Sequence, residues 1–384
     1  MQKFEKYYGH LLVVLCLLVH FLVLTHFGIR NLFDAVVYER EADFLFQSGR
    51  LEEADHIFYF VPIALIGFFK WISHGQIMPY LIFQMTISGL AMLSLYASSS
   101  RIFNSKLAGL ISGSIFLLWW DNIHWNTTTM TESLLCSVTC FIVYYLTFFR
   151  NTFKEYGIVI VLLLIAFFIR PTGIVIILGT VAFFLSYHWS ALKARPILKF
   201  FCIACIFFAG LLGASVMFSQ WDFTDQLKRG NIVTYMDTIE GSTLYQESMH
   251  IKMTDEELSN STKHPLFKMV LFVVHNPIHF LKTASLKIWY LISFYRPYYS
   301  TAHIFFSMSW TFLIYILFFF GFRNTLHPIK IFAATVIIVN CALIGMATVD
   351  WDNRFFIPME PGIVLLAGGG GTLLYKRLIS LRSK

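Results

Sequence analysis

Apolar windows separated by short polar intervals recur along almost the whole chain. Many of them approach the roughly 17–25 residues that a helix needs to cross the hydrocarbon core of a bilayer. This pattern predicts an all-α, polytopic membrane protein with about 10–12 transmembrane helices, several of them short enough to be tilted or only half-buried. The expected membrane segments are residues 9–27, 57–73, 77–97, 107–120, 133–149, 157–169, 171–187, 198–218, 285–297, 303–322, 331–348 and 358–375.

The composition supports a single integral membrane domain spanning residues 1–384. Hydrophobic residues make up 57% of the chain, charged residues only 13%, and the mean hydropathy is +0.66. A soluble protein of this length cannot bury so much apolar surface. The first apolar window follows Lys3 and Lys6 but lacks a small-residue cleavage site, so we expect a retained helix rather than a signal peptide.

The charge distribution predicts an orientation. The net charge is +7, and the basic residues sit mostly in short loops between apolar windows, as the positive-inside tendency requires of cytoplasmic loops. The acid-bearing loops 28–56, 121–131, 219–266 and 350–357 then face the other side. One conflict remains, because two crossings between residues 57 and 97 would leave Arg101 and Lys106 outside. Either 57–73 is not a full span or this loop departs from the charge rule.

The sequence argues against several classes of site. All six cysteines lie inside apolar windows, so neither a disulfide framework nor a cysteine zinc site is expected. His275 and His279 have the i,i+4 spacing of paired metal ligands but no acidic third ligand nearby, and no metal site is predicted. Nucleotide-binding and hydrolase motifs are absent, and the basic charge indicates membrane orientation rather than nucleic-acid binding. The loop 219–266 is too short for an independent domain and is expected to act as a lid over the membrane face.

The first polar loop concentrates acids. Seven of the 22 acidic residues lie in the stretch 33–56, FDAVVYEREADFLFQSGRLEEADH. FDAVVYEREADFLF reads as a short helix on the membrane surface, with Asp34, Tyr38 and Glu41 on one face. Two interpretations stay open: a solvated loop whose acids keep it outside, or a site in which Asp34 acts as general base toward an acceptor hydroxyl.

Charged residues at helix ends supply further candidates. Glu132 opens an apolar run, where it either belongs to a helix cap with Thr131 or faces a cavity. Arg170, Arg296 and Arg354 are predicted at outer-face helix ends. A guanidinium group grips a phosphate bidentately, although a snorkelling arginine is the simpler explanation for each.

The order of these features resembles the GT-C membrane glycosyltransferases, in particular the bacterial relatives of the dolichyl-phosphate-mannose-protein mannosyltransferase and aminoarabinose transferase group. The motifs that carry the resemblance run from FDAVVYEREADFLFQSG after the first helix, through FYFVPIALIGFFKW, TESLL, RPTG and HNPIHFLK, to RFFIPMEPGIVLLAGG near the end. The resemblance implies transfer of a sugar from a polyprenyl-phosphate carrier to an acceptor on the non-cytoplasmic face.

The resemblance also assigns residues. The family's essential acid just after the first helix matches Asp34, but Ala35 stands where many members have a second acid, which leaves open whether Glu39, Glu41 or Asp43 assists. Arg354 and Arg296 match the basic residues that bind the lipid phosphate. Glu132 and Arg170 match recurrent positions of less defined role.

The sequence therefore predicts a glycosyltransferase that uses a lipid-linked sugar in a multi-pass membrane setting, expected to be a bacterial inner membrane with the site on the periplasmic face. The expected partners are membrane lipids, the polyprenyl-linked sugar and a glycan, lipid or protein acceptor. The sequence establishes no cofactor beyond the donor, and metal dependence varies across the family that the chain resembles. The candidate residues are, for catalysis, Asp34, Glu41 and Glu132; for the donor phosphate, Arg354, Arg296 and Arg170; and for substrate contacts, Tyr38, His124 and Tyr295.

Two alternatives are kept. A lipid-linked-sugar flippase or secondary transporter would place charges near the bilayer midplane and break helices in two matching halves. Arg170–Pro171 is one such candidate break, but the second half offers no counterpart. An O-antigen-type polymerase would place its key residues in a large late outer loop, for which 219–266 is the candidate.

Overall fold

A computed structural model of the chain describes residues 5–31, 34–189, 230–233, 265–350 and 352–382. Over these ranges the chain is helical, with two isolated β-bridges and no β-strand. The contacts divide it into two compact units. The first comprises residues 1–183, 313–333 and 357–384, and the second residues 184–312 and 334–356. The all-α class predicted from the apolar windows is confirmed.

The helices of the first unit follow the predicted windows closely. Those that begin and end inside it are α2 (Tyr8–Phe27), α3 (Asp34–Ser48), α4 (Phe60–Ile72), α5 (Met78–Ile102), α6 (Lys106–Leu118), α7 (Trp120–Ile123), α8 (Glu132–Thr147), α9 (Phe153–Ile169) and α19 (Glu360–Arg382), with short 3-10 helices η1 (Ala54–Tyr59) and η2 (His124–Thr127). Within the described residues, six segments are long and apolar enough to cross a membrane, and three further apolar helices are shorter.

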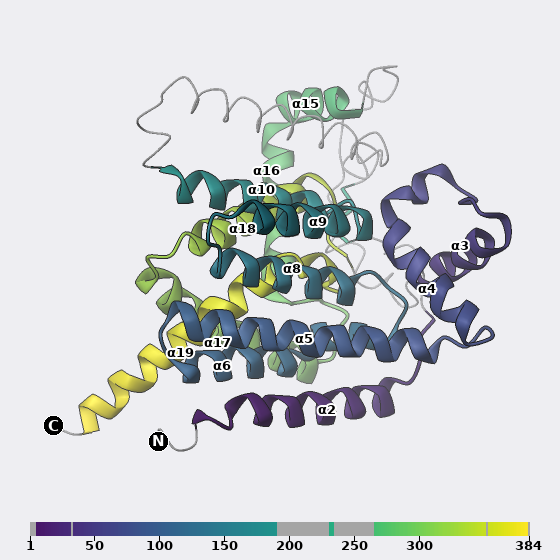
Figure 1. Cartoon of the computed structure of the whole chain (residues 1–384). Coiled ribbons are helices and arrows are strands. Elements are labelled where there is room, and N and C mark those ends of the chain that lie inside the picture. The colour runs from purple at the N-terminus through teal and green to yellow at the C-terminus, as the bar shows by residue number, and fades with distance from the viewer. Residues whose placement is uncertain (1–4, 32–33, 190–229, 234–264, 351, 383–384) are drawn as a thin grey trace. The chain divides into compact units, whose positions relative to one another are not determined.

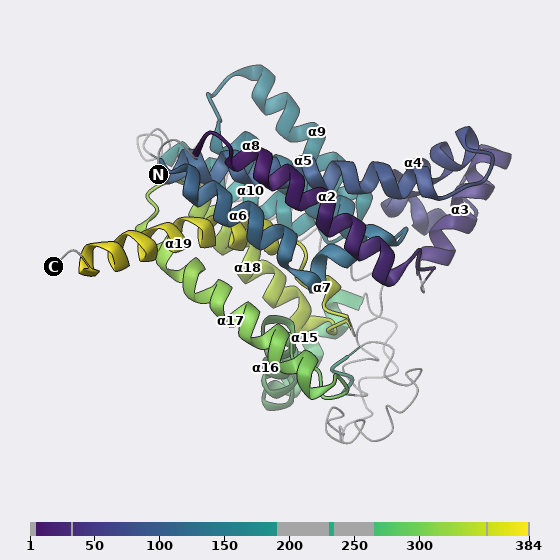
Figure 2. The same cartoon turned by 90° about the horizontal axis from the view of Figure 1, so that it is seen from below.

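The long helices of this unit form a bundle around α5, α6, α8 and α19. α5 packs against both α6 and α8, α19 packs against α6, and α2 covers α6 from outside. Figures 1 and 2 show α2, α5 and α6 running alongside one another in both views. The core between them is aliphatic, with Leu81, Leu95, Leu117, Val143 and Leu365 fully or almost fully buried.

The first polar loop folds into α3 and η1, so the expected short helices of this loop are present. Together with α4 they lie at the end of the bundle where α2 ends and α5 begins (Figure 1). α3 buries Ala35, Tyr38 and Ala42. Gly67 of α4 lies directly against the ring of Phe46, so the two helices approach closely. This arrangement positions the acids of the loop over the end of the bundle.

The second unit contains α15 (Pro265–His275), α16 (Pro277–Ser293) and η4 (Arg354–Phe356). Residues of α10 (Gly173–Tyr187), α17 (Thr301–Asn324) and α18 (Ile329–Met346) belong to both units. Lys287 of α16 donates to the Ala347 carbonyl oxygen at 2.5 Å, and the Val349 amide donates to Ile232 at 2.9 Å. These bonds tie the segment after α18 to α16 and to the short described stretch 230–233.

One predicted segment differs from the structure, and two others lie wholly or mostly outside the described residues. The expected membrane helix 285–297 belongs to α16, which begins at Pro277 and ends at Ser293, followed by Phe294 in the left-handed conformation. Pro297 disfavours helical geometry at Arg296 and favours an early end to the helix. The expected segment 198–218 and nearly all of the predicted lid 219–266 lie outside the described residues.

Candidate active site

The predicted site residues fall in both units. The first unit holds Asp34, Tyr38, Glu41, His124, Glu132 and Arg170, and the second holds Tyr295, Arg296 and Arg354. Each group is described by itself.

Asp34 is the first residue of α3 and is half-buried. A carboxylate at a helix N-terminus is favoured by the positive end of the helix dipole. Tyr38 follows one turn later, almost fully buried, with its ring 5.3 Å from that of Tyr59. The predicted common face of Asp34 and Tyr38 thus points toward the interior of the loop helices.

The charged neighbours of Tyr38 shift the pKa of its phenol. Burial raises the pKa of its phenol well above the usual value, and the neighbouring Tyr59 and the carboxylates of Asp34 and Glu132 raise it further, while Arg170 opposes them. Four residues predicted from separate parts of the sequence (Asp34, Tyr38, Glu132 and Arg170) are therefore brought into one electrostatic neighbourhood. The Tyr38 hydroxyl stays protonated at ordinary pH and can act only as a hydrogen-bonding group there, not as a base.

Glu132 and Arg170 form a buried ion pair. Glu132 begins α8 with no exposed surface, and its Oε1 accepts a hydrogen bond from Arg170 Nη1. Thr131 occupies the N-cap position, but its side chain does not cap the backbone and instead donates to Glu132 Oε2 at 3.3 Å. Arg170 lies in extended backbone at the end of α9 with its side chain 6% exposed. The structure therefore does not support the helix-cap explanation for Glu132 or the snorkelling explanation for Arg170.

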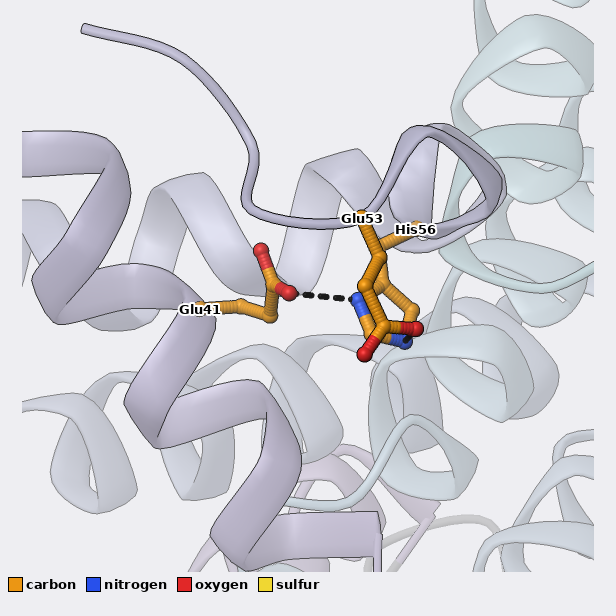
Figure 3. A group of neighbouring side chains, drawn as sticks. All are labelled: Glu41, Glu53 and His56. Carbon is orange, nitrogen blue, oxygen red and sulfur yellow. Dashed lines mark hydrogen bonds and ion pairs between the residues drawn. The ribbon is translucent and has the colours of Figure 1, made fainter. Parts of the chain in front are cut away.

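Glu41 is engaged on both carboxylate oxygens. It is fully buried, Oε2 accepts from the Glu52 amide at 3.0 Å, and Oε1 lies 2.7 Å from His56 Nδ1 (Figure 3). These contacts hold the segment 49–59 against α3. The geometry favours a positioning role for Glu41 over that of a base.

The other two candidate helpers are engaged as well. Glu39 Oε1 accepts a hydrogen bond from the Thr129 hydroxyl at 2.9 Å, which joins α3 to the segment before α8. Asp43 is 2.6 Å from Lys70 Nζ of α4. Each of these three acids therefore has a structural contact, and the role of Asp34 as the base stays a prediction from the sequence.

His124 is buried beside aromatic rings. Its Nδ1 lies 3.1 Å from the Trp120 carbonyl oxygen, and its ring centroid is 4.4 Å from that of Trp125 and 5.7 Å from that of Phe27. Gln84 of α5 holds the same segment by donating to the Trp125 carbonyl at 2.9 Å. These contacts favour packing over substrate binding for His124.

A polar pocket next to the ion pair was not predicted. Its walls include Asn122, Asn126, Glu132, Cys136 and Glu360. Cys136 Sγ donates to Glu360 Oε2 at 3.5 Å, and Glu360 is almost fully buried at the start of α19. An acid between two prolines at the start of an apolar run, in IPMEPG, was the available signal for Glu360.

In the second unit, Arg296 is fully buried and bonded to the backbone. Nη1 donates to the carbonyl oxygens of Tyr290 and Tyr295 at 2.6 and 2.8 Å, and Nη2 donates to that of Asp350 at 2.8 Å. The preceding Phe294 has a φ of 57°, which is rare for a bulky residue and costs conformational energy. These contacts lock the end of α16 and do not favour a phosphate-binding role for Arg296.

Arg354 lies in η4 with its Nε on the Asp350 carboxylate and its guanidinium 5.5 Å from the Phe355 ring centroid. Asn353 precedes it in the left-handed conformation, with a φ of 59°. Tyr295 stacks on Tyr290 with a centroid separation of 5.9 Å. Arg354 is almost fully buried with its charge compensated by Asp350, and its role at the donor phosphate stays a prediction from the sequence.

Comparison with known proteins supports the fold. No protein-family model and no curated protein sequence matches the chain. Among solved structures, it is similar to the archaeal oligosaccharyltransferase AglB from Archaeoglobus fulgidus, determined in complex with an inhibitory peptide and a dolichol-phosphate. The TM-score is 0.52 at 12% sequence identity, over 99% of this chain and 52% of that one. The chain spans about half the length of that enzyme, and at this identity the likeness concerns the fold alone.

Proposed function

We propose that the chain is a glycosyltransferase that moves a sugar from a polyprenyl-phosphate carrier to an acceptor on the non-cytoplasmic face of the membrane, expected to be the periplasmic face of a bacterial inner membrane. The observation that carries the proposal is the grouping of Asp34 with buried Tyr38 and the Glu132–Arg170 pair around the first loop. The fold likeness supports it, because the similar enzyme was solved with a dolichol-phosphate, a lipid of the expected donor class.

The chemistry needs a base, a phosphate-binding group and good orientation of both substrates. The acceptor hydroxyl oxygen attacks the anomeric carbon, the bond from that carbon to the phosphate oxygen breaks, and polyprenyl phosphate leaves with the bonding electrons. Asp34 receives the hydroxyl proton, since a positioned carboxylate accelerates such a step about 10²–10⁴-fold. One displacement inverts the anomeric centre, as the resemblance to GT-C enzymes implies.

The remaining residues are assigned by their contacts. Arg354 binds the donor phosphate, because guanidinium matches phosphate geometry. The Glu132–Arg170 pair lies near Tyr38 and helps to position the helices of the first loop. Tyr38 keeps its proton and orients Asp34 or a substrate hydroxyl.

The test of the base is Asp34→Asn, assayed by transfer of radiolabelled sugar from polyprenyl phosphate in membranes. We expect a loss of about 10²–10⁴-fold in rate with normal expression. Asp43→Asn is the matched control, since Asp43 lies on the same helix, is 49% exposed and pairs with Lys70. It should leave transfer nearly unchanged. Full activity of the Asp34 variant would remove Asp34 from the mechanism.

The test of the phosphate group must separate binding from folding, because Arg354 also pairs with Asp350. Arg354→Gln alone leaves a buried carboxylate without this partner, whereas the double variant Arg354→Gln/Asp350→Asn removes both charges. We expect the double variant to regain stability while its KM for the donor stays raised. A donor KM equal to that of the unaltered protein in the double variant would assign Arg354 a structural role alone.

A transporter of lipid-linked sugars is the second candidate. It is favoured by the buried carboxylates Glu132 and Glu360 in one polar pocket, since acids inside membrane helices mark substrate or ion pathways. Proteoliposomes distinguish the two: a transporter moves a fluorescent lipid-linked sugar across the bilayer without forming a product, whereas a transferase forms product on one face.

A further inference from the structure

We propose that Glu53 and His56 form a binding site for a divalent transition metal of the zinc class, with Glu41 as the positioning carboxylate behind the histidine. The bound metal would join Glu53 to His56 within the segment 49–59, while Glu41 of α3 orients the histidine. The proposal departs from the expectation that the chain holds no metal, and it is independent of the proposed sugar transfer.

Glu41 contacts the His56 ring at Nδ1. His56 Nδ1 is 2.7 Å from Oε1 of Glu41, a carboxylate with no exposed surface (Figure 3). A carboxylate at Nδ1 holds the proton on that nitrogen and leaves the Nε2 lone pair available, as in the carboxylate–histidine–zinc arrangement of metalloproteins. The Glu41–His56 contact therefore fixes the tautomer and the ring orientation that a metal requires.

The other ring nitrogen, Nε2, lies near Glu53, the second proposed ligand. His56 Nε2 is 3.7 Å from Oε2 of Glu53. Two ligands that each lie about 2.0–2.2 Å from one ion fit this separation, at an angle somewhat wider than tetrahedral. The side chain of Glu53 is 60% exposed and that of His56 is 16% exposed, so water can complete the coordination. The imidazole nitrogen favours zinc over the oxygen-seeking cations calcium and magnesium.

Glu41 is not itself a ligand in this arrangement. The metal-ligating atoms of Glu41, Glu53 and His56 all lie within 4.8 Å of one another, but 2.7 Å between Glu41 and His56 is a hydrogen-bond distance. Two nitrogen or oxygen ligands of one zinc ion at tetrahedral angles would stand about 3.4 Å apart. Glu41 acts through the histidine.

Arg40 is the competing cation. Its Nη2 is 3.7 Å from Oε1 of Glu53, and its Nε is 3.1 Å from Oε2 of Glu52. The guanidinium approaches Oε1 of Glu53, whereas His56 lies nearer Oε2, so its charge weakens metal binding without occupying the proposed ligand oxygen. Removing this charge should strengthen binding, an effect opposite in sign to that of damage to the fold.

The experiment is a zinc titration of the full chain in detergent, with any affinity tag removed and metal stripped by a chelator, followed by competition with a chromophoric chelator. We expect one zinc ion per chain and weaker binding by about tenfold or more in Glu53→Gln and His56→Ala. Arg40→Gln should bind zinc more tightly. Asp43→Asn is the matched control, because its side chain lies on the same helix as Glu41, is 49% exposed and pairs with Lys70.

A second readout tests whether the metal orders the segment. Zinc should slow proteolytic cleavage within the segment 49–59 in the unaltered protein and in Asp43→Asn, but not in Glu53→Gln. Equal zinc affinity in the unaltered protein and Glu53→Gln, or a weakening shared by Asp43→Asn, would overturn the site. Weaker binding in Arg40→Gln would do the same.

Discussion

At the scale of single residues, the ion pair between Glu132 and Arg170 is the most consequential contact of the candidate site. Both side chains are almost completely removed from water, at the start of α8 and the end of α9. Desolvation of two charges offsets much of their attraction, so such a pair adds little to stability as a unit. Loss of one member is a different matter, because the other charge then stays buried without its counter-ion.

We therefore expect Glu132→Gln to lower the free energy of unfolding by about 3–5 kcal/mol. The double variant Glu132→Leu/Arg170→Met should recover most of that loss, since apolar side chains of similar volume replace a buried pair at little cost. Thermal unfolding followed by tryptophan fluorescence in detergent measures both. If the double variant is no more stable than the single one, charge compensation is not what holds α8 to α9.

The double variant of Glu132 and Arg170 also distinguishes a role in stability from a role in catalysis. The double variant should fold yet transfer sugar poorly if Glu132 and Arg170 orient Tyr38 and Asp34. A variant that is both stable and fully active would restrict the pair to a structural role.

At the scale of elements, glycines let α19 approach its neighbours. A Cβ built at Gly370 would overlap the Leu317 carbonyl oxygen of α17, and one built at Gly321 would overlap the Leu366 carbonyl oxygen of α19. All four residues belong to the first unit. Small residues at such crossings are how membrane helices pack closely without a hydrophobic driving force between them.

Gly370→Ala should therefore destabilise the protein by about 1–3 kcal/mol, because the added methyl group must move backbone rather than a flexible side chain. Gly157→Ala is the control, since a Cβ at that position of α9 meets nothing within 4 Å. It should be neutral or slightly stabilising, by up to about 1 kcal/mol, through better helix propensity. Thermal unfolding in detergent compares the two, and equal destabilisation would contradict the close-packing explanation.

At the scale of the whole molecule, the sequence was sufficient for the helices and named residues of the candidate site, but it did not indicate which residues these contact. Apolar periodicity placed α2 and α5 because each carries its own signal, and the acid cluster indicated Asp34. His56 lies 15 residues from Glu41, and Arg170 lies 38 residues from Glu132. Contacts over such separations depend on tertiary packing. No local pattern in a single sequence indicates which distant residues will pack together.

Such contacts also bear on the conflict in the predicted orientation. The segment Ala54–Ile72 is long and apolar enough to span a membrane by composition, with a mean hydropathy of 1.3. Yet its beginning is bound to α3 through His56 and Glu41, and its end through Lys70 and Asp43. Glu41 and Asp43 are two positions apart on one helix. A segment whose two ends meet neighbouring residues does not cross a hydrocarbon core of about 30 Å, and the 13 residues of α4 cover only about 20 Å.

We therefore expect α4 to return to the face it started from, so that α5 makes the second crossing and Arg101 and Lys106 face the cytoplasm, as the charge rule requires. Single cysteines at the exposed positions Gln47, Gln76 and Asn104, in a chain whose six native cysteines are replaced by alanine, test this arrangement. A membrane-impermeant maleimide should label Gln47→Cys and Gln76→Cys in intact cells, and Asn104→Cys only after the membrane is opened. Labelling of positions 47 and 76 from opposite sides would instead make α4 a full span and leave Arg101 outside.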